Sequence, residues 1–139
     1  MSKLVHISEA ASIAMHSLAL IASSSKKLNA KQMSALLQVS HNHLAKVLQV
    51  LAKNDYLTSN RGPDGGFIMK KSPDKITMLE IYELIEGTVD CQFCGITTDS
   101  CPFIVCIFGD KPDKLTNEFT DYMRITKISD LKTKEIRHA

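Results

Sequence analysis

The chain has 139 residues, of which 44% are hydrophobic and 23% charged, and its formal net charge is +2. This balance is typical of a folded protein with one packed core and excludes a disordered tail, while the charge is too small to identify a nucleic-acid binder by itself. No apolar run approaches the roughly 20 residues that span a bilayer, and the first residues lack the pattern of a secretory signal. We therefore expect a cytoplasmic protein that does not associate with membranes.

Three helices are predicted in the first part of the chain. Ser8 can cap a helix over residues 8–23, and Asn29 can cap a short one over 30–37. After a tight turn, Ser40 can cap a third helix, whose apolar residues recur every three or four positions until Asn54. Two short helices joined by such a turn form a helix-turn-helix.

A β-hairpin is predicted next. Residues 56–59 and 67–70 have strand-like composition, and the six residues 61–66 between them are rich in turn formers. A hairpin at this place is the wing of a winged helix-turn-helix. A further helix is expected over residues 77–86, ending at Gly87.

The last predicted helix starts at Asp110 or Asp113 and runs to about Lys127. Its apolar stripe predicts a dimer interface and consists of Leu115, Phe119, Tyr122 and Met123. The expected fold class is mainly α with a small β-hairpin. We expect a winged helix-turn-helix domain at 1–87, a cysteine-rich sensor loop at 88–109, and a long C-terminal dimerisation helix with its tail at 110–139.

The third helix and the hairpin tip carry side chains suited to reading DNA. Asn and Gln pair with adenine, Lys contacts guanine or phosphate, and a helix N-terminus binds phosphate. An arginine at the tip can enter a minor groove, and glycine allows close backbone approach. The candidate DNA-binding residues are Ser40, His41, Asn42, His43, Lys46, Gln49, Arg61 and Gly62. Each alone is more often a solvated surface residue, and winged folds also serve as protein-interaction modules without DNA binding, but the combination favours DNA.

Four cysteines crowd into one predicted loop: Cys91, Cys94, Cys101 and Cys106. Thiolates suit an iron–sulfur cluster or zinc, and the spacing is irregular for a zinc ribbon, so zinc fits less well. A reversible disulfide between Cys91 and Cys94 is a further alternative. Cys106, between Val105 and Ile107, could also be a buried core residue.

An enzyme is not expected. The sequence has no glycine-rich phosphate loop, no candidate Ser-His-Asp arrangement and no His-Glu-x-x-His helix. Its only dense chemistry is sulfur.

The sequence resembles the Rrf-two family of bacterial winged-helix transcription regulators, which includes an iron–sulfur cluster assembly regulator and a nitric-oxide-sensing repressor. The resemblance covers nearly the whole chain. It rests on Ile7-Ser8, Val39-Ser40-His41-Asn42-His43-Leu44, Leu51-Ala52-Lys53-Asn54, Tyr56-Leu57, Arg61-Gly62-Pro63-Asp64-Gly65-Gly66-Phe67, Ile76-Thr77 and Ile85-Glu86-Gly87.

This resemblance implies a homodimer crossed through the C-terminal helices, with the third helix in the major groove and Arg61 in the minor groove. It also implies a [2Fe–2S] or [4Fe–4S] cluster held by three cysteines, which Cys91, Cys101 and Cys106 match best. The sequence departs from the family at three places. Cys94 is extra, Ile107-Phe108-Gly109 replaces a histidine that some members carry, and Ala45 replaces a base-reading glutamate, so no operator can be carried over.

The hypothesis from sequence is a DNA-binding transcription regulator, with repression the expected mode, that senses iron–sulfur, nitric oxide or redox status. Assembly or loss of the cluster would reshape the loop, tilt the last helix and change the spacing of the two recognition helices. Two-fold symmetry predicts an imperfect palindrome in double-stranded DNA. A structural zinc site or a thiol switch in place of the cluster is the alternative.

Overall fold

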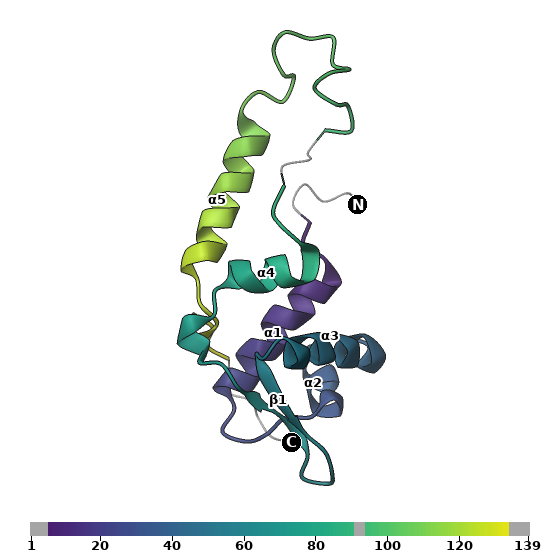
Figure 1. The fold of residues 1–139 in the computed structure, drawn as a ribbon, viewed down its shortest axis with the longest axis vertical. Helices are drawn as coiled ribbons and strands as arrows, with labels where there is room; N and C mark the ends of the chain where they lie inside the picture. Colours follow the sequence, from purple (N-terminus) through teal and green to yellow (C-terminus); the bar gives the residue numbers. More distant parts are fainter. Residues whose placement is uncertain (1–5, 91–93, 134–139) are drawn as a thin grey trace.

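The computed structural model describes residues 6–90 and 94–133. Helices α1 (Glu9–Ser23), α2 (Ala30–Leu37) and α3 (His41–Lys53) come first, followed by strands β1 (Leu57–Asn60) and β2 (Gly66–Met69). Helices α4 (Met78–Glu86) and α5 (Lys111–Ile125) complete the fold, with short 3-10 turns at Pro73–Lys75 and Ile128–Asp130. The predicted fold class, mainly α with one small hairpin, is confirmed (Figure 1).

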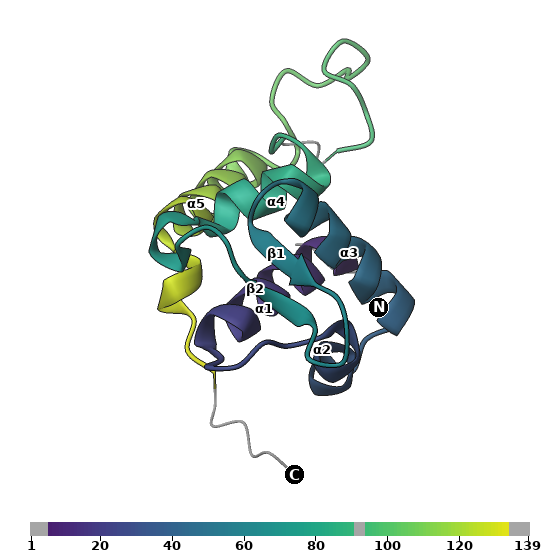
Figure 2. The same cartoon turned by 60° about the horizontal axis from the view of Figure 1, so that its bottom comes forward.

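Helix α1 is the centre of the core. Nine of its 15 residues are buried, because apolar or small side chains surround almost the whole helix. It packs against α3, α4, β2 and the 3-10 turn at Ile128–Asp130 (Figures 1 and 2). Helix α3 and the hairpin therefore stand on one shared core.

Local capping fixes the helix-turn-helix. The Ser8 hydroxyl accepts a hydrogen bond from Ala11 N at 3.1 Å, and Asn29 forms a reciprocal capping box with Gln32. Helix α2 ends where Gln38 adopts a left-handed conformation with φ 55°, and Ser40 then caps α3. The predicted caps and the predicted turn are confirmed.

The hairpin pairs Leu57 with Met69 and Asn60 with Gly66 in antiparallel register. Both strands lie within one residue of their predicted positions. Phe67 N also donates to Leu28 O at 2.8 Å, so the segment before α2 adds a short bridge to β2. A Cβ on Gly66 would lie 2.8 Å from Leu28 O, so only glycine fits this approach without a shift.

Helix α5 packs against α4 and extends away from the winged-helix body, with the segment before it at its far end (Figure 1). Gly87 ends α4 with φ 87°, as its position in the sequence predicts. Within residues 6–90 and 94–133, every helix is too short or too polar to cross a membrane.

Candidate DNA-binding surface and cysteine segment

The third helix presents one polar face to solvent. Leu44, Val47, Leu48 and Leu51 are buried, which fixes the orientation of α3 on the core. The opposite face exposes Asn42, Lys46 and Gln49, together with His41 at the start of the helix. The structure thus places these predicted residues together on one accessible helix surface.

Two predicted residues at the start of α3 also have structural contacts. The Ser40 hydroxyl accepts a hydrogen bond from His43 N at 3.4 Å, so Ser40 caps the helix. His43 is half-buried, and its Nδ1 lies 3.6 Å from a carboxylate oxygen of Glu9 in α1. Because of this contact and its partial burial, the His43 side chain is less accessible than those of His41 and Asn42.

The wing, residues 57–69, follows α3 after the short connection at residues 54–56. Its first strand, β1, packs against α3 (Figure 2). Arg61 and Gly62 stand exposed at its tip. Gly62 has φ 104°, and Gly65 N donates to Gly62 O at 2.9 Å, which closes the turn. The recognition helix and the wing tip therefore belong to one connected part of the molecule.

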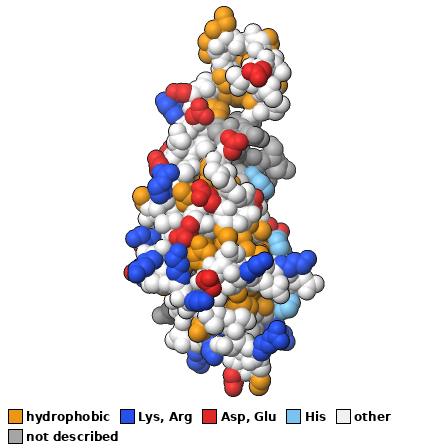
Figure 3. All heavy atoms as spheres, in the orientation of Figure 1, with side chains coloured by type: hydrophobic (Ala, Val, Ile, Leu, Met, Phe, Trp, Pro, Cys, Tyr) orange, Lys and Arg blue, Asp and Glu red, His pale blue; other side chains and the backbone are white. Residues whose placement is uncertain are grey.

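Sequence reasoning missed two cations beside the wing. Lys26 and Lys27 are exposed. The Cβ of Lys27 lies 3.2 Å from the position that a Cβ would occupy if Gly66 carried one. The pairing of Leu28 with Phe67 brings these lysines to the hairpin. Figure 3 shows most Lys and Arg side chains over the lower part of the molecule, around a central apolar patch, and further apolar side chains at the upper end. Positive charge near α3 and the wing favours contact with phosphates.

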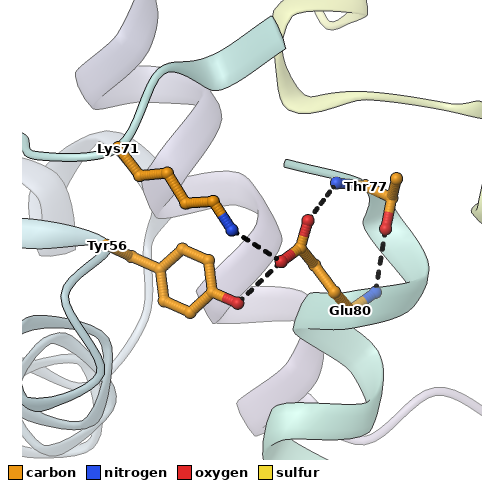
Figure 4. Close-up of polar contacts among 4 residues, drawn as sticks. All are labelled: Tyr56, Lys71, Thr77 and Glu80. Carbon is orange, nitrogen blue, oxygen red and sulfur yellow. Dashed lines mark hydrogen bonds and ion pairs between the residues drawn. The ribbon is translucent and has the colours of Figure 1, made fainter. Parts of the chain in front are cut away.

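A polar network ties the base of the wing to α4 (Figure 4). The Tyr56 hydroxyl donates to a Glu80 oxygen at 2.8 Å, and the Lys71 ammonium lies 3.2 Å from the same oxygen. The other Glu80 oxygen accepts from Thr77 N at 2.7 Å. The pattern Thr77-x-x-Glu80 is a capping-box signature that could have identified the Thr77 contact, but it carries no signal for Tyr56.

The network shifts two pKa values. Burial, the hydrogen bond to Glu80 and the charge of Glu80 raise the pKa of Tyr56 to about 12. Burial by itself would raise the pKa of Glu80. The hydrogen bonds from Thr77 N, Tyr56 and Lys71 and the positive charge of Lys71 outweigh burial, so the pKa of Glu80 lies below its usual value. Glu80 is therefore a carboxylate at neutral pH.

The described part of the cysteine segment, residues 88–90 and 94–109, is largely exposed. Cys94 and Cys106 are exposed, Cys101 is half-buried, and all three are free thiols. Cys91 lies outside the described residues. Ser100 N and Cys101 N both donate to Thr97 O at 3.0 Å, and Gly109 N donates to Cys106 O at 2.9 Å. These short turns give the segment its local shape.

The donor set fits an iron–sulfur or zinc site by its chemistry, because soft thiolates are the ligands these groups prefer. The exposure of Cys94 and Cys106 argues against the alternative that these residues serve only as core. Among the described residues, however, no group of three or more His, Cys, Asp or Glu side chains lies close enough together to hold a metal ion. Cys91, which belongs to the predicted ligand set, lies outside that part of the chain.

The predicted stripe on α5 divides between two environments. Leu115, Phe119 and Tyr122 are exposed, and the Phe119 and Tyr122 rings stack with centroids 6.3 Å apart. Met123 is only 4% exposed and belongs to the core of its own chain, so it offers almost no surface to a partner. Ile125, which sequence reasoning missed, is 74% exposed.

Comparison with known proteins places the chain among transcriptional regulators. A family model described as "Rrf2: Iron-dependent Transcriptional regulator" matches residues 7–134. An HTH-type transcriptional regulator of Aquifex aeolicus is 35% identical over 98 residues, which are 68% of each chain. The HTH-type transcriptional regulator BadM of Rhodopseudomonas palustris is 37% identical over 71 residues, which cover 51% of this chain and 46% of BadM.

Solved structures show the same fold at low sequence identity. CymR, the global cysteine regulator of B. subtilis, matches with a TM-score of 0.72 and 18% identity over 91% of this chain and 95% of CymR. IscR of T. potens matches with a TM-score of 0.65 and 20% identity over 91% of this chain and 85% of IscR.

Proposed function

Because this chain belongs to the Rrf2 family of transcriptional regulators, we propose that it binds double-stranded DNA as a homodimer and controls transcription in response to the state of its cysteine segment. Its relatives are regulators rather than enzymes. The observation that carries the DNA-binding proposal is the exposed polar face of α3 next to a wing with Arg61 at its tip. The expected target is an imperfect palindrome, because a two-fold dimer presents two recognition helices.

In this proposal Asn42, Lys46 and Gln49 read bases in the major groove and Arg61 enters the minor groove. His41 extends the same surface, Ser40 holds the helix start near a phosphate, and His43 contributes from the side facing Glu9. Gly62 allows the backbone at the tip to approach DNA closely.

The cysteine segment is the proposed sensor. An iron–sulfur cluster would be held by Cys91, Cys101 and Cys106, with Cys94 as a possible fourth ligand, and its electron transfer or loss would supply the signal chemistry. A zinc site or a thiol switch between Cys91 and Cys94 remains the second candidate, supported by the free, exposed thiol of Cys94. The position of the segment between α4 and α5 supports either version, because a change there acts on both helices.

The DNA-binding proposal is tested with Arg61→Ala on a duplex selected by the wild-type protein from a random pool. Loss of the wing contact is expected to weaken binding by about 5- to 150-fold, the range for one specific arginine contact. Arg124→Ala on α5 is the matched control, because it removes the same charge from an exposed arginine that pairs with Asp121. Equal affinity of Arg61→Ala and wild type would contradict the wing contact, and absence of any DNA affinity would contradict the function.

The sensor proposal is tested by anaerobic purification followed by absorption spectroscopy and analysis of iron, sulfide and zinc. Cys101→Ala is expected to lose the bound group while it remains folded. Comparison with Cys94→Ala shows whether the fourth thiol is a ligand. Iron and sulfide would establish a cluster and zinc alone a structural site. A Cys101→Ala protein that still responds like wild type would rule out the cysteine sensor.

A further inference from the structure

Glu80 on α4 is the one carboxylate drawn in Figure 4, and it contacts both the wing base and its own helix start. We propose that Glu80 is a positioning residue for DNA binding: it holds the base of the wing to α4 and so sets where Arg61 meets DNA. This inference rests on the proposed function. It adds a residue that neither touches DNA nor belongs to the cysteine segment.

The wing side of the contact is rigidly built. Tyr56 precedes β1, and its carbonyl oxygen accepts hydrogen bonds from Lys70 N at 3.0 Å and Lys71 N at 3.5 Å just after β2. The Lys71 ammonium also lies 5.2 Å from the centre of the Tyr56 ring. Tyr56 and Lys71 thus close the two ends of the hairpin against each other. Because both then reach Glu80, a displacement of Glu80 acts on the whole wing rather than on one strand.

The helix side connects the same residue to α5. Thr77 and Glu80 cap α4 reciprocally, with the Thr77 hydroxyl accepting from Glu80 N at 3.1 Å. One residue on, Met78 N donates to Thr126 O at 2.8 Å, and Ile128 N donates to Ile76 O at 2.9 Å. The start of α4 and the end of α5 are therefore joined by backbone hydrogen bonds.

The cysteine segment lies between the end of α4 and the start of α5. A change in that segment moves one or both helices, and both meet beside Glu80. The half-buried Glu80 side chain, 29% exposed, is the polar connection from this junction to the wing. From the junction of α4 and α5 to the wing, the contacts are contiguous, so each can be tested by a substitution at one residue.

Glu80→Gln distinguishes the contacts of Glu80 with Tyr56 and Lys71 of the wing from its contact with Thr77 at the start of α4. Glutamine also serves at the third position of a capping box, so the contact with Thr77 N is retained. Its amide nitrogen, however, would face the Tyr56 hydroxyl and the Lys71 ammonium, and the negative charge that pairs with Lys71 is gone. The substitution therefore replaces the ion pair with Lys71 by two facing donors and reverses the hydrogen bond with Tyr56, while it preserves the start of α4.

The experiment is a double-mutant cycle on DNA affinity between Glu80→Gln and Arg61→Ala, with the full-length protein and one selected duplex. If Glu80 acts through the wing, Glu80→Gln weakens binding by about 3-fold or more when Arg61 is present and by less than about 2-fold when Arg61 is already alanine. Asp55→Asn is the matched control. It removes an exposed ion pair with Lys70 at the same wing base, 2.8 Å long, without touching α4, and should leave affinity unchanged.

Equal losses in both Arg61 backgrounds would reduce Glu80 to a general structural role and overturn the inference, as would no loss in either. Failure of the proposed function is recognised separately, because then wild type and Arg61→Ala bind DNA equally or not at all. In that case amide hydrogen exchange decides. Faster exchange of Phe67 and Lys70 in Glu80→Gln than in Asp55→Asn shows that Glu80 holds the wing to α4 even though the DNA role has failed, and unchanged exchange refutes that connection too.

Discussion

Ser17 shows at the scale of one residue that the core is not fully optimised. Its side chain is completely buried in α1, and its hydroxyl lacks a hydrogen-bond partner among the described residues. A buried unpaired hydroxyl costs about 1–3 kcal/mol. We expect Ser17→Ala to raise the free energy of unfolding by about 1 kcal/mol in urea titrations. Ser23→Ala, the same exchange at an exposed position of the same helix, measures how much of the change in unfolding free energy comes from helix propensity. A less stable Ser17→Ala protein would mean that the hydroxyl is paired in solution.

Glu80 makes a second prediction at this scale, on pH dependence. Its pKa is lowered in the folded chain, so its contribution to stability is present above the unfolded pKa of about 4.3 and is lost as pH falls through the folded pKa. Glu80→Gln should therefore be less stable than wild type at pH 7, and the difference should shrink toward zero below about pH 4. Urea unfolding from pH 3 to 7 measures this. Glu83→Gln, exposed on the same helix, is the control, and a difference that is constant with pH would contradict the charge-based account.

At the scale of elements, the helices were predictable because their ends are encoded locally. Ser8, Asn29, Ser40 and Thr77 each cap the helix that follows, and a cap needs only residues within one turn. Apart from the capping contact between Thr77 and Glu80, the contacts that sequence reasoning missed join residues distant in the chain. Tyr56 and Glu80 are 24 residues apart, and neither helical period nor strand alternation links them.

Helix α5 shows the same limit within one element. A helical period groups Phe119, Tyr122 and Met123 as one apolar stripe, but it cannot divide the stripe between two neighbours. In the structure Met123 packs into the core of its own chain, whereas Phe119 and Tyr122 stay exposed. The position of α5 against α4 decides this, and that position follows from backbone contacts at Thr126 and Ile128.

The approach of Leu28 to the wing gives a prediction at this scale. A Cβ on Gly66 would lie 2.8 Å from Leu28 O, a backbone atom that cannot move without breaking the bridge to Phe67. Gly66→Ala should lower the free energy of unfolding by about 1–3 kcal/mol and weaken DNA binding. Gly95→Ala is the control, because a Cβ there meets nothing within 4 Å. Thermal unfolding compares the two, and equal melting temperatures would show that the bridge is not tight in solution.

At the scale of the whole molecule, most of the large exposed hydrophobic residues that the structure describes lie outside the winged-helix body, which carries Leu36, Val50 and Ile68. The large exposed hydrophobic residues beyond the winged-helix body lie in the cysteine segment and on α5, and they are Ile96, Phe103, Ile104, Val105, Ile107, Phe108, Leu115, Phe119, Tyr122 and Ile125. Contiguous exposed apolar surface marks a site of association. This distribution supports the proposed dimer joined through α5, which extends away from the winged-helix body (Figure 1).

The final prediction separates assembly from folding along α5. Phe119→Glu places a charge on the exposed part of the stripe, so it should convert the proposed dimer to a monomer at micromolar concentration while the circular dichroism spectrum stays that of the folded chain. Met123→Ala should do the reverse: it should cost about 2–5 kcal/mol of stability, because it empties a buried site, and leave the folded fraction dimeric. Sedimentation equilibrium measures the mass of each variant.

Asn117→Glu, which places the same charge at an exposed polar position on the same helix, is the control for added charge. A dimeric Phe119→Glu protein would place the interface elsewhere. If Phe119→Glu is monomeric, its affinity for a palindrome should fall to that for a single half-site, because only a dimer presents two recognition helices to one duplex.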